Sequence, residues 1–443
     1  MRILITTDWY KPVINGVVTS VLNLSEGLRK RGHEVKILTL SSDRHYYEED
    51  NVIYMGSFGM GCIYPNARVK IPLFHKELKK LIDWKPDIIH SQCEFSTFFV
   101  AKKISEVLNI PIVHTYHTIY EDYTHYFSIN QKWGRNITMF LTKKLSERVT
   151  SIIAPTEKIR TLLDGYGVNC EVDVIPSGID LKKYRSMDLD VASIHSNNLN
   201  IAGMNLDVAN TDSDNSDMNG LDFDNDNIDS NKKENQTEIQ LEAPKIEWRK
   251  RLCRKYNIPE DKYVLLYVGR LAKEKNIEEL LHFQKKAAAY GTVLVLVGDG
   301  PARKELEEYT KNLEIEDSVY FLGMVAPEQV GKYYRAGDLF VSASTSETQG
   351  LTYAEALASG LPLLCRKDEC LDALVTEKEN GWQYKDEQSF MDKLQEWIHL
   401  EREEKARMSH KAEASIDALS VDVFVETVER LYKREKEWWD YAA

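Results

Sequence analysis

The chain has 443 residues, too many for one ordinary hydrophobic core, so we expect two domains. Hydrophobic residues make up 43% of it and aromatic residues 10%, and no apolar run approaches the roughly 18 residues that span a bilayer, which argues against a transmembrane protein. Six cysteines without paired or metal-type spacing favour reduced thiols in a cytoplasm, and Asp8 comes too early for a secretory signal peptide.

The formal net charge of −13 is unevenly spread along the chain. Residues 1–185 contain 25 basic and 20 acidic residues, a net charge of +5, whereas residues 187–245 contain 13 acidic and 3 basic residues, a net charge of −10. Residues 246–443 therefore carry the remaining −8. The basic first part favours contact with an anionic membrane surface, and we expect no nucleic-acid partner.

Residues 1–185 alternate apolar, strand-like runs with helical patterns. A strand is predicted at 2–7 and a loop at 12–16, and apolar residues then recur at helical spacing up to Gly32, at Val17, Val21, Leu24 and Leu28. Further strands are predicted at 34–40, 86–90, 110–114, 151–155 and 172–176, with a helix at 95–108. This alternation predicts a parallel sheet with helices on both of its faces.

The segment 186–245 breaks this pattern and is dominated by Asn and Asp. It contains too little apolar surface to offset the entropy of ordering, so we expect it to be disordered. Asp222–Asp226 begins like a calcium loop, but Asn227 and Lys233 occupy the positions where such a loop requires Gly and Glu. A solvated surface loop is the stronger interpretation.

The alternation restarts in residues 246–420. Strands are predicted at 263–268, 292–297, 319–322, 339–341 and 361–365, with helices at 277–290 and 302–313. Two such halves predict a clefted α/β enzyme with its ligand at the carboxyl ends of the strands. A last helix, about 421–443, either packs back on the first half or closes its own domain.

Two segments of the second half have the chemistry of a phosphate site. Arg270 and Lys275 lie between a strand end and a helix start, where positive charge and the helix dipole suit a diphosphate; the alternative is an ordinary basic loop. Gly298 ends the next strand and permits close backbone approach to a ligand, although a tight turn explains it equally well. In the first half, Gly16 opens a helix in the same way, and the absence of a GxGxxG fingerprint argues against a dinucleotide oxidoreductase.

Two carboxylates, Glu347 and Glu355, bracket a helix start that follows Gly350. Free N–H groups there can face an anion, while carboxylates accept hydrogen bonds from hydroxyl groups, so a nucleotide sugar is a ligand that suits both. The alternative is helix electrostatics, because acids near a helix start are stabilised by its dipole. That alternative applies to Glu355 more than to Glu347, which lies outside the helix.

The segment 114–125 combines three tyrosines with three histidines directly after a predicted strand. This composition suits a sugar and an acceptor at the edge of a cleft. The rival is a metal held by His114, His117 and His125, although their spacing matches no standard metal motif. A packing role within the strand is the simpler interpretation for His114.

Two basic segments, 74–85 and 132–148, interleave Lys and Arg with large apolar residues. The apolar members are Phe74, Leu78, Leu81, Ile82 and Trp84 in the first segment, and Trp133, Ile137, Phe140 and Leu141 in the second. Basic amphipathic helices can lie on anionic membranes, whereas a solvated helix face over the core is the usual alternative. The net charge of +5 favours the membrane.

Together these residues resemble family 4 of the retaining glycosyltransferases, whose fold is GT-B. The pair Glu347 and Glu355 matches that family's E-x7-E motif. The resemblance implies an α/β protein with two Rossmann-like domains whose parallel sheets face a central cleft. Within the family, segments 114–126 and 342–360 look closest to the bacterial 1,2-diacylglycerol 3-alpha-glucosyltransferases, which make monoglucosyldiacylglycerol, a precursor of lipoteichoic-acid anchors.

The resemblance also implies roles for individual residues. Arg270 and Lys275 match the pair that binds the donor diphosphate, Glu355 the glutamate on the nucleotide ribose, and Glu347 the glutamate near the hydroxyls of the transferred sugar. Four further positions match donor-side or catalytic residues of the family. These are Leu351 and Thr352 through their backbone N–H groups, Gly16 beside the donor, and His117 near the reaction centre.

The implied reaction is transfer of glucose from UDP-glucose to 1,2-diacylglycerol with retention. Residues 1–185 would bind the acceptor and residues 246–420 the donor, on a peripheral protein at the inner face of the cell membrane. No tightly bound cofactor is expected, UDP-glucose serves as the donor substrate, and any Mg²⁺ would not be bound through a protein metal site. The alternatives are another sugar donor or acceptor, a nucleotide-sugar epimerase, and a non-catalytic scaffold that uses the insert to bind partners.

Overall fold

The computed structural model describes residues 1–41, 45–59, 68–69, 76–121, 131–185 and 247–442. Residues 1–185 and 261–442 belong to one compact unit. The predicted disorder of 186–245 and the candidate calcium loop within it lie outside the described residues.

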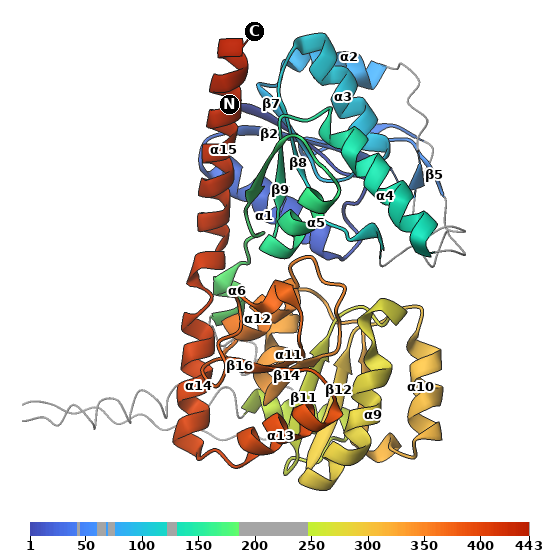
Figure 1. Cartoon of the computed structure of the whole chain (residues 1–443), viewed down its shortest axis with the longest axis vertical. Helices are drawn as coiled ribbons and strands as arrows, with labels where there is room; N and C mark the ends of the chain where they lie inside the picture. Colours follow the sequence, from blue (N-terminus) through green and yellow to red (C-terminus); the bar gives the residue numbers. More distant parts are fainter. Residues whose placement is uncertain (42–44, 60–67, 70–75, 122–130, 186–246, 443) are drawn as a thin grey trace, which may run out of the picture. The chain divides into compact units, whose positions relative to one another are not determined.

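An eight-stranded sheet forms the first half of the compact unit (Figure 1). Its strand order is β10-β9-β8-β7-β1-β2-β4-β3, and all neighbours pair in parallel except β3 with β4. The strands are β1 (Arg2–Thr6), β2 (Glu34–Leu40), β3 (Tyr47–Glu49), β4 (Val52–Met55), β7 (Ile88–Ser91), β8 (Ile112–Thr115), β9 (Ser151–Ala154) and β10 (Glu171–Val174). β5 (Phe58–Gly59) and β6 (Arg68–Val69) form a separate antiparallel pair.

Helices cover both faces of this sheet, as the sequence predicted. Alternate residues of β1 point to opposite faces, so Ile3 and Ile5 pack with apolar residues of α1 (Gly16–Lys30), whereas Leu4 packs with residues of α2 (Lys76–Trp84) and α3 (Ser96–Leu108). Three more helices follow in chain order: α4 (Gln131–Ser146), α5 (Glu157–Gly165) and α6 (Leu181–Arg185).

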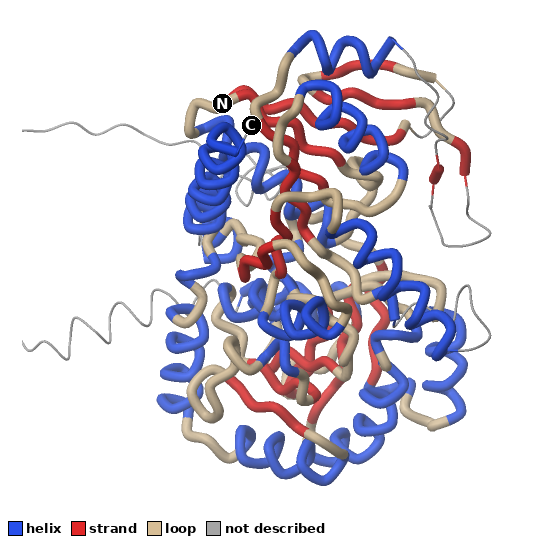
Figure 2. Tube along the Cα trace, turned by 45° about the horizontal axis from the view of Figure 1, so that its top comes forward, coloured by secondary structure: helices blue, strands red, loops and turns tan. Residues whose placement is uncertain are grey.

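A six-stranded, all-parallel sheet forms the second half, in the order β13-β12-β11-β14-β15-β16. Its strands are β11 (Tyr263–Val268), β12 (Thr292–Val297), β13 (Val319–Gly323), β14 (Leu339–Ser342), β15 (Leu363–Arg366) and β16 (Gly381–Tyr384). The helices around it are α9 (Ile277–Ala287), α10 (Arg303–Asn312), α11 (Val330–Ala336), α12 (Leu351–Ala358), α13 (Glu387–Ile398) and α14 (Arg402–Ala414). Figure 2 shows these strands enclosed by helices.

The last helix, α15 (Val421–Ala442), packs along α1 of the first half. Val425 lies so close to Gly27 that a Cβ atom there would come within 2.4 Å of Val425 Cγ2. Arg31 at the end of α1 forms an ion pair with Glu429. Apolar residues of α15, among them Val428 and Tyr432, join the core on the α1 face of the first sheet.

The two basic amphipathic segments differ in what their apolar residues do. In α2, Leu81 is buried and Leu78, Ile82 and Trp84 pack against the core, so a helix face over the core accounts for that pattern. In α4, Phe140 and Leu141 are 60% and 58% exposed. Phe74 lies outside the described residues.

Candidate functional site

Three loops of the second sheet meet at the carboxyl ends of adjacent strands. β11 pairs with both β12 and β14, so the loops that follow these strands lie side by side, where parallel sheets place their ligands. The loop after β11 carries Lys275 and the loop after β14 carries Glu347, and Lys275 Nζ is 2.6 Å from Glu347 Oε1. The structure thus joins two residues that the sequence analysis had assigned separately.

The pair Lys275 and Glu347 is ionised. Burial alone raises the pKa of Glu347, but the positive charge and hydrogen bond of Lys275 lower it below the ordinary value, helped by Ser344 and Lys158. Burial likewise lowers the pKa of Lys275, and Glu347 raises it above its ordinary value. A preformed ammonium group at a strand end can bind a phosphate oxygen, and the carboxylate can accept hydrogen bonds from hydroxyl groups.

Arg270 and Gly298 lie in neighbouring loops of the same sheet edge. Arg270 forms an ion pair with Glu274. Gly298 has a φ of +135°, and a Cβ atom there would fall 1.9 Å from the carbonyl oxygen of Gly269. The close approach that Gly298 permits in this structure is therefore to the loop after β11, and its contact with a ligand stays a prediction.

Glu355 lies one turn into α12 and is held by hydroxyl groups rather than by a cation. Its Oε2 accepts a hydrogen bond from Tyr334 at 2.8 Å, and Tyr184 donates to it as well. Burial raises the pKa of Glu355, and these two tyrosines oppose the shift without cancelling it. The net pKa shifts of the two motif glutamates are therefore opposite in direction.

The start of α12 lies against the first half of the chain. Gly350 caps the helix with a φ of +71°, and a Cβ atom there would clash with Tyr353 at 2.2 Å. Leu351 and Thr352 begin the first turn, whose N–H groups have no acceptor within the helix. A Cβ atom on Gly16 would lie 3.6 Å from Leu351, an ordinary contact, so the structure brings Gly16 to the predicted phosphate-binding helix start.

His117 joins the same region through its backbone and its ring. Its carbonyl oxygen accepts a hydrogen bond from Thr348 Oγ1 at 3.0 Å, next to Glu347, and its Nε2 is 2.6 Å from Gln92 Oε1. Burial lowers the pKa of His117 to about 4, with Glu94 opposing this shift. The ring is therefore neutral near pH 7.

The rival metal site is not supported by the part of the chain that the structure describes. His114 is fully buried in β8, with its Nε2 3.3 Å from Glu94 Oε1, and His125 lies outside the described residues. Within those residues, no group of three His, Cys, Asp or Glu side chains could hold a metal ion.

The sequence analysis missed the residues of the first half that form hydrogen bonds to the loop carrying Glu347. Lys158 on α5 donates to the backbone carbonyls of Thr345 and Glu347 at 3.0 and 3.1 Å, and it binds both carboxylate oxygens of Asp368 at 2.7 and 2.8 Å. Thr156 Oγ1 donates to the carbonyl of Thr348 at 2.8 Å.

Gln349, in the same loop, forms two further hydrogen bonds of 2.8 Å to the first half, one to the backbone N–H and one to the carbonyl of Ser177. The sequence offered one indication of their role: Thr156, Lys158 and Ser177 each closely follow a predicted strand. Their hydrogen-bond partners lie roughly 170 to 210 positions away in the sequence, for example 210 positions from Lys158 to Asp368, so local patterns did not reveal them.

Family comparisons divide the chain as the two sheets do. Residues 14–183 match Glycosyltransferase Family 4, and residues 249–415 match Glycosyl transferases group 1. The chain is 34% identical over 393 residues to alpha-monoglucosyldiacylglycerol synthase of Streptococcus pneumoniae, covering 87% of this chain and 75% of that protein. It is 31% identical over 446 residues to the enzyme of the same name from Acholeplasma laidlawii, covering 98% of this chain and 96% of that protein.

Solved structures of glycosyltransferases share the fold. Anabaena HepE in complex with UDP and glucose superposes with a TM-score of 0.65 at 16% identity, covering 98% of this chain and all of that one. Sucrose-phosphate synthase from Thermosynechococcus elongatus superposes with a TM-score of 0.67 at 18% identity, covering 98% of each. Likeness at such low identity concerns the fold alone, and it confirms the predicted GT-B architecture with two Rossmann-like domains.

Proposed function

The chain belongs to glycosyltransferase family 4, and from that premise we propose that it transfers glucose from UDP-glucose to the free hydroxyl of 1,2-diacylglycerol, forming alpha-monoglucosyldiacylglycerol. The observation that carries the proposal is identity of 34% and 31% to two alpha-monoglucosyldiacylglycerol synthases over most of the chain. HepE, which shares the fold, binds UDP and glucose, and this supports a UDP-sugar donor.

The donor is assigned to the loops after β11 and β14. Lys275 and Arg270 bind the diphosphate, and Glu355 accepts hydrogen bonds from the ribose. Glu347 accepts hydrogen bonds from the glucose, and the first-turn N–H groups of α12 complete the anion site, including those of Leu351 and Thr352. The ion pair of Lys275 and Glu347 supports this assignment, because it aligns a cation and a hydroxyl acceptor 2.6 Å apart at one strand edge.

Leaving-group stabilisation by fixed charge accounts for the chemistry that these residues perform. Cleavage of the anomeric bond places negative charge on the departing UDP, and Lys275, Arg270 and the dipole of α12 stabilise it in a site that excludes water. No carboxylate is assigned as a nucleophile. The acceptor hydroxyl attacks on the face that the diphosphate leaves, and the departing phosphate oxygen takes its proton, which retains the anomeric configuration.

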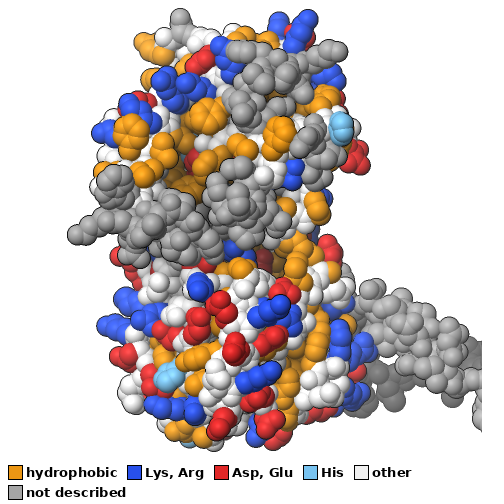
Figure 3. Space-filling view, turned by 90° about the vertical axis from the view of Figure 1, so that its right-hand side faces the viewer, with side chains coloured by type: hydrophobic (Ala, Val, Ile, Leu, Met, Phe, Trp, Pro, Cys, Tyr) orange, Lys and Arg blue, Asp and Glu red, His pale blue; other side chains and the backbone are white. Residues whose placement is uncertain are grey.

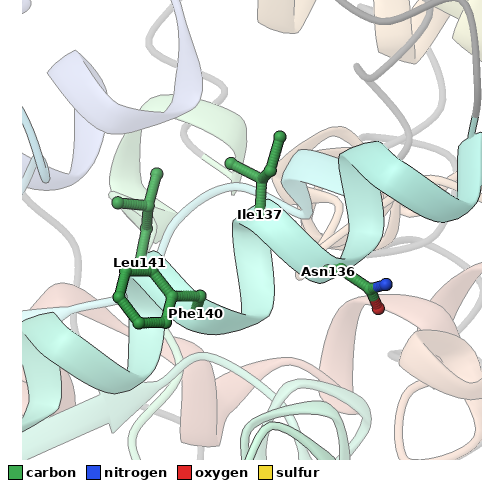
Figure 4. Close-up of a pocket in the computed structure, with 4 residues that line it drawn as sticks. All are labelled: Asn136, Ile137, Phe140 and Leu141. Atoms are coloured by element: carbon green, nitrogen blue, oxygen red, sulfur yellow. The ribbon is translucent and has the colours of Figure 1, made fainter.

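The acceptor is proposed to reach the site from an anionic membrane surface. Among the described residues, no helix has the length and hydropathy to cross a bilayer. α4 instead carries exposed apolar side chains beside Lys143 and Lys144. Ile137 and Leu141 project from the same side of α4, and together with Asn136 and Phe140 they line a hollow (Figure 4).

On the face shown in Figure 3, hydrophobic side chains are prominent on the half that belongs to residues 1–185, whereas acidic and basic side chains intermix on the other half. An apolar row flanked by lysines suits insertion below anionic headgroups. We place the protein at the inner face of the cell membrane for this reason.

One assay tests the proposed reaction. Purified protein is incubated with UDP-glucose or UDP-galactose and with diacylglycerol vesicles, and the lipid products are separated and their anomeric configuration is determined by NMR. We expect an alpha-glucosyl monoglycolipid from UDP-glucose. Release of UDP without a glycolipid, conversion of one UDP-sugar into another, or no turnover at all would each reject the proposal.

Vesicle flotation tests the membrane surface. Changing both Phe140 and Leu141 to Ser is expected to reduce the fraction of protein that floats with anionic vesicles, because the exposed apolar area is removed. Met324, which is equally exposed but lies in the second half of the chain, provides the control variant Met324→Ser. Equal flotation of all three proteins would contradict the assignment of α4.

A further inference from the structure

A buried chain of hydrogen bonds leads from α15 to His117. Tyr432 Oη is 2.5 Å from His90 Nδ1 at the end of β7, and His90 Nε2 is 3.0 Å from Gln92 Nε2. Gln92 Oε1 is in turn 2.6 Å from His117 Nε2. Tyr432, His90 and Gln92 are each at most 2% exposed, so water does not compete for these bonds.

The amide group of Gln92 determines which atom donates and which accepts in each of these hydrogen bonds. Its NH₂ group can only donate and its oxygen can only accept. His90 Nε2 therefore carries no proton, accepts also from Thr115 Oγ1 at 2.7 Å, and leaves His90 Nδ1–H to donate to Tyr432. At the other end, Gln92 Oε1 accepts from His117 Nε2–H, so Nδ1 of His117 keeps its lone pair.

Both histidine rings are neutral in these surroundings. Burial lowers the pKa of His117 to about 4; the carboxylate of Glu94 opposes this shift and His114 reinforces it. Burial lowers the pKa of His90 well below its ordinary value, and His114 and His117 add to the effect. These are the titratable groups that act on the two rings, beside the hydroxyl of Tyr432.

We infer that Gln92 is a positioning residue that holds His117 as its Nε2–H tautomer, which leaves Nδ1 to accept a hydrogen bond from a hydroxyl group of the transferred sugar. The inference rests on the proposed function, in which His117 lies beside that sugar. The other tautomer presents an N–H group where the hydroxyl needs an acceptor. Because Tyr432 anchors the far end of the chain, α15 contributes to the site although its own residues do not reach it.

Two replacements of similar size separate tautomer control from packing. Gln92→Met removes both the donor and the acceptor and leaves His117 free to adopt either tautomer. Gln92→Glu keeps an acceptor for Nε2–H but adds a negative charge, which raises the pKa of His117. The matched control is Gln284→Met, because Gln284 is equally buried and bonds Thr292 within the second half of the chain.

The direct measurement is NMR of the full-length protein labelled with [¹⁵N]histidine. Two-bond ¹H–¹⁵N couplings report which ring nitrogen carries the proton, and His117→Asn assigns the signal. We expect His117 to be a single Nε2–H tautomer in the wild type and in Gln284→Met. We expect a mixture of tautomers in Gln92→Met, and a cationic ring at higher pH in Gln92→Glu.

The kinetic measurement uses the same proteins. We expect kcat to fall roughly tenfold in Gln92→Met, about the effect of one hydrogen bond, with a smaller change in the KM for the donor. In Gln92→Glu the loss of kcat at low pH moves to higher pH, because a raised pKa of His117 lets Nδ1 gain its proton earlier. Gln284→Met keeps the wild-type pH profile.

The inference is overturned if wild-type His117 carries its proton on Nδ1, or if Gln92→Met and Gln284→Met change the tautomer and kcat alike. The NMR result does not depend on turnover. A wild-type protein that transfers no sugar but shows the Nε2–H tautomer would reject the proposed function and still uphold the role of Gln92 in setting that tautomer.

Discussion

Replacing Lys158 with methionine tests whether the first half of the chain holds the Glu347 loop in place. Lys158 Nζ binds both carboxylate oxygens of Asp368 and the backbone carbonyls of Thr345 and Glu347, at 2.7 to 3.1 Å. Methionine keeps most of the volume and removes all four bonds. Asp368, whose side chain is only 4% exposed, then loses its cationic partner.

The expected magnitude follows from that burial. Removing one partner of a buried ion pair costs about 3 to 5 kcal/mol, and the 17% exposure of Lys158 favours the lower end. A loss of about 3 kcal/mol corresponds to a factor of roughly 100 in an equilibrium constant. Because two of the four bonds hold the loop that carries Glu347, we expect the kcat/KM for the donor to fall by about 10- to 100-fold.

Lys393→Met is the matched control for this prediction. Lys393 also binds two carboxylate oxygens, at 2.8 and 3.1 Å, but its partner Glu377 is 51% exposed. An exposed pair contributes about 1 kcal/mol at most. Thermal unfolding and donor kinetics of both variants are compared. A kcat/KM within twofold of wild type for Lys158→Met, with no more loss of stability than Lys393→Met, would refute the reasoning.

Further predictions concern the donor site. Gly16→Ala is expected to fold normally but to raise the KM for the donor, whereas Gly298→Ala is expected to lower the melting temperature, because only the latter places a Cβ atom 1.9 Å from a backbone oxygen; equal melting temperatures would contradict this. Lys275→Met is expected to reduce kcat at least 100-fold, and to reverse the sign of the contribution that Glu347 makes to the pH dependence of stability. In the wild type the lowered pKa of Glu347 gives stability that is lost as pH falls, whereas without Lys275 burial raises that pKa and stability increases as pH falls, as melting curves from pH 4 to 8 would show. Transfer is expected to persist in EDTA at a reduced or equal rate, because Lys275 and Arg270 stabilise the charge on the leaving UDP. Loss of transfer in EDTA and its recovery on addition of Mg²⁺ would contradict this prediction.

The buried parallel strands were the easiest elements to predict. β2, β11 and β12 coincide with the predicted segments 34–40, 263–268 and 292–297. Strands buried on both faces read as near-continuous runs of Val, Ile and Leu, which no surface helix shows. β4 and β16 were not predicted. β16 has two apolar residues, Trp382 and Tyr384, among its four, so its pattern is weak. β4 was missed although all of its residues, Val52–Met55, are apolar.

The residues that we propose to bind the donor could be selected from the sequence because their chemistry is local. Lys275 and Glu347 each follow a strand that ends at the sheet edge, so position and residue type together indicated a phosphate and a sugar. That the two form one ion pair was not predictable, because it depends on the pairing of β11 with β14 across 72 residues of sequence.

The buried hydrogen bonds that lead from Tyr432 to His117 were not predictable for a different reason. His90 was included in a predicted strand and Tyr432 falls within the predicted last helix, and both side chains are buried. Their polar atoms meet only because α15 packs on the first sheet, 342 residues after His90. Gln92 carries no signal of its own, since a lone glutamine after a strand is usually solvated.

The two motif glutamates show why matching a motif does not assign a role. Glu347 is surrounded by the cations Lys275 and Lys158, which keep it ionised although it is largely buried. Glu355, eight residues later, is hydrogen-bonded by the neutral hydroxyls of Tyr334 and Tyr184; these bonds and the more weakly acting Lys183 do not offset burial, and its pKa is raised. A carboxylate beside fixed cations can stay charged while charge develops on the sugar and on the leaving group. A carboxyl group hydrogen-bonded by hydroxyls suits the binding of an uncharged ribose. The difference between the two glutamates follows from their neighbours rather than from their spacing in the sequence.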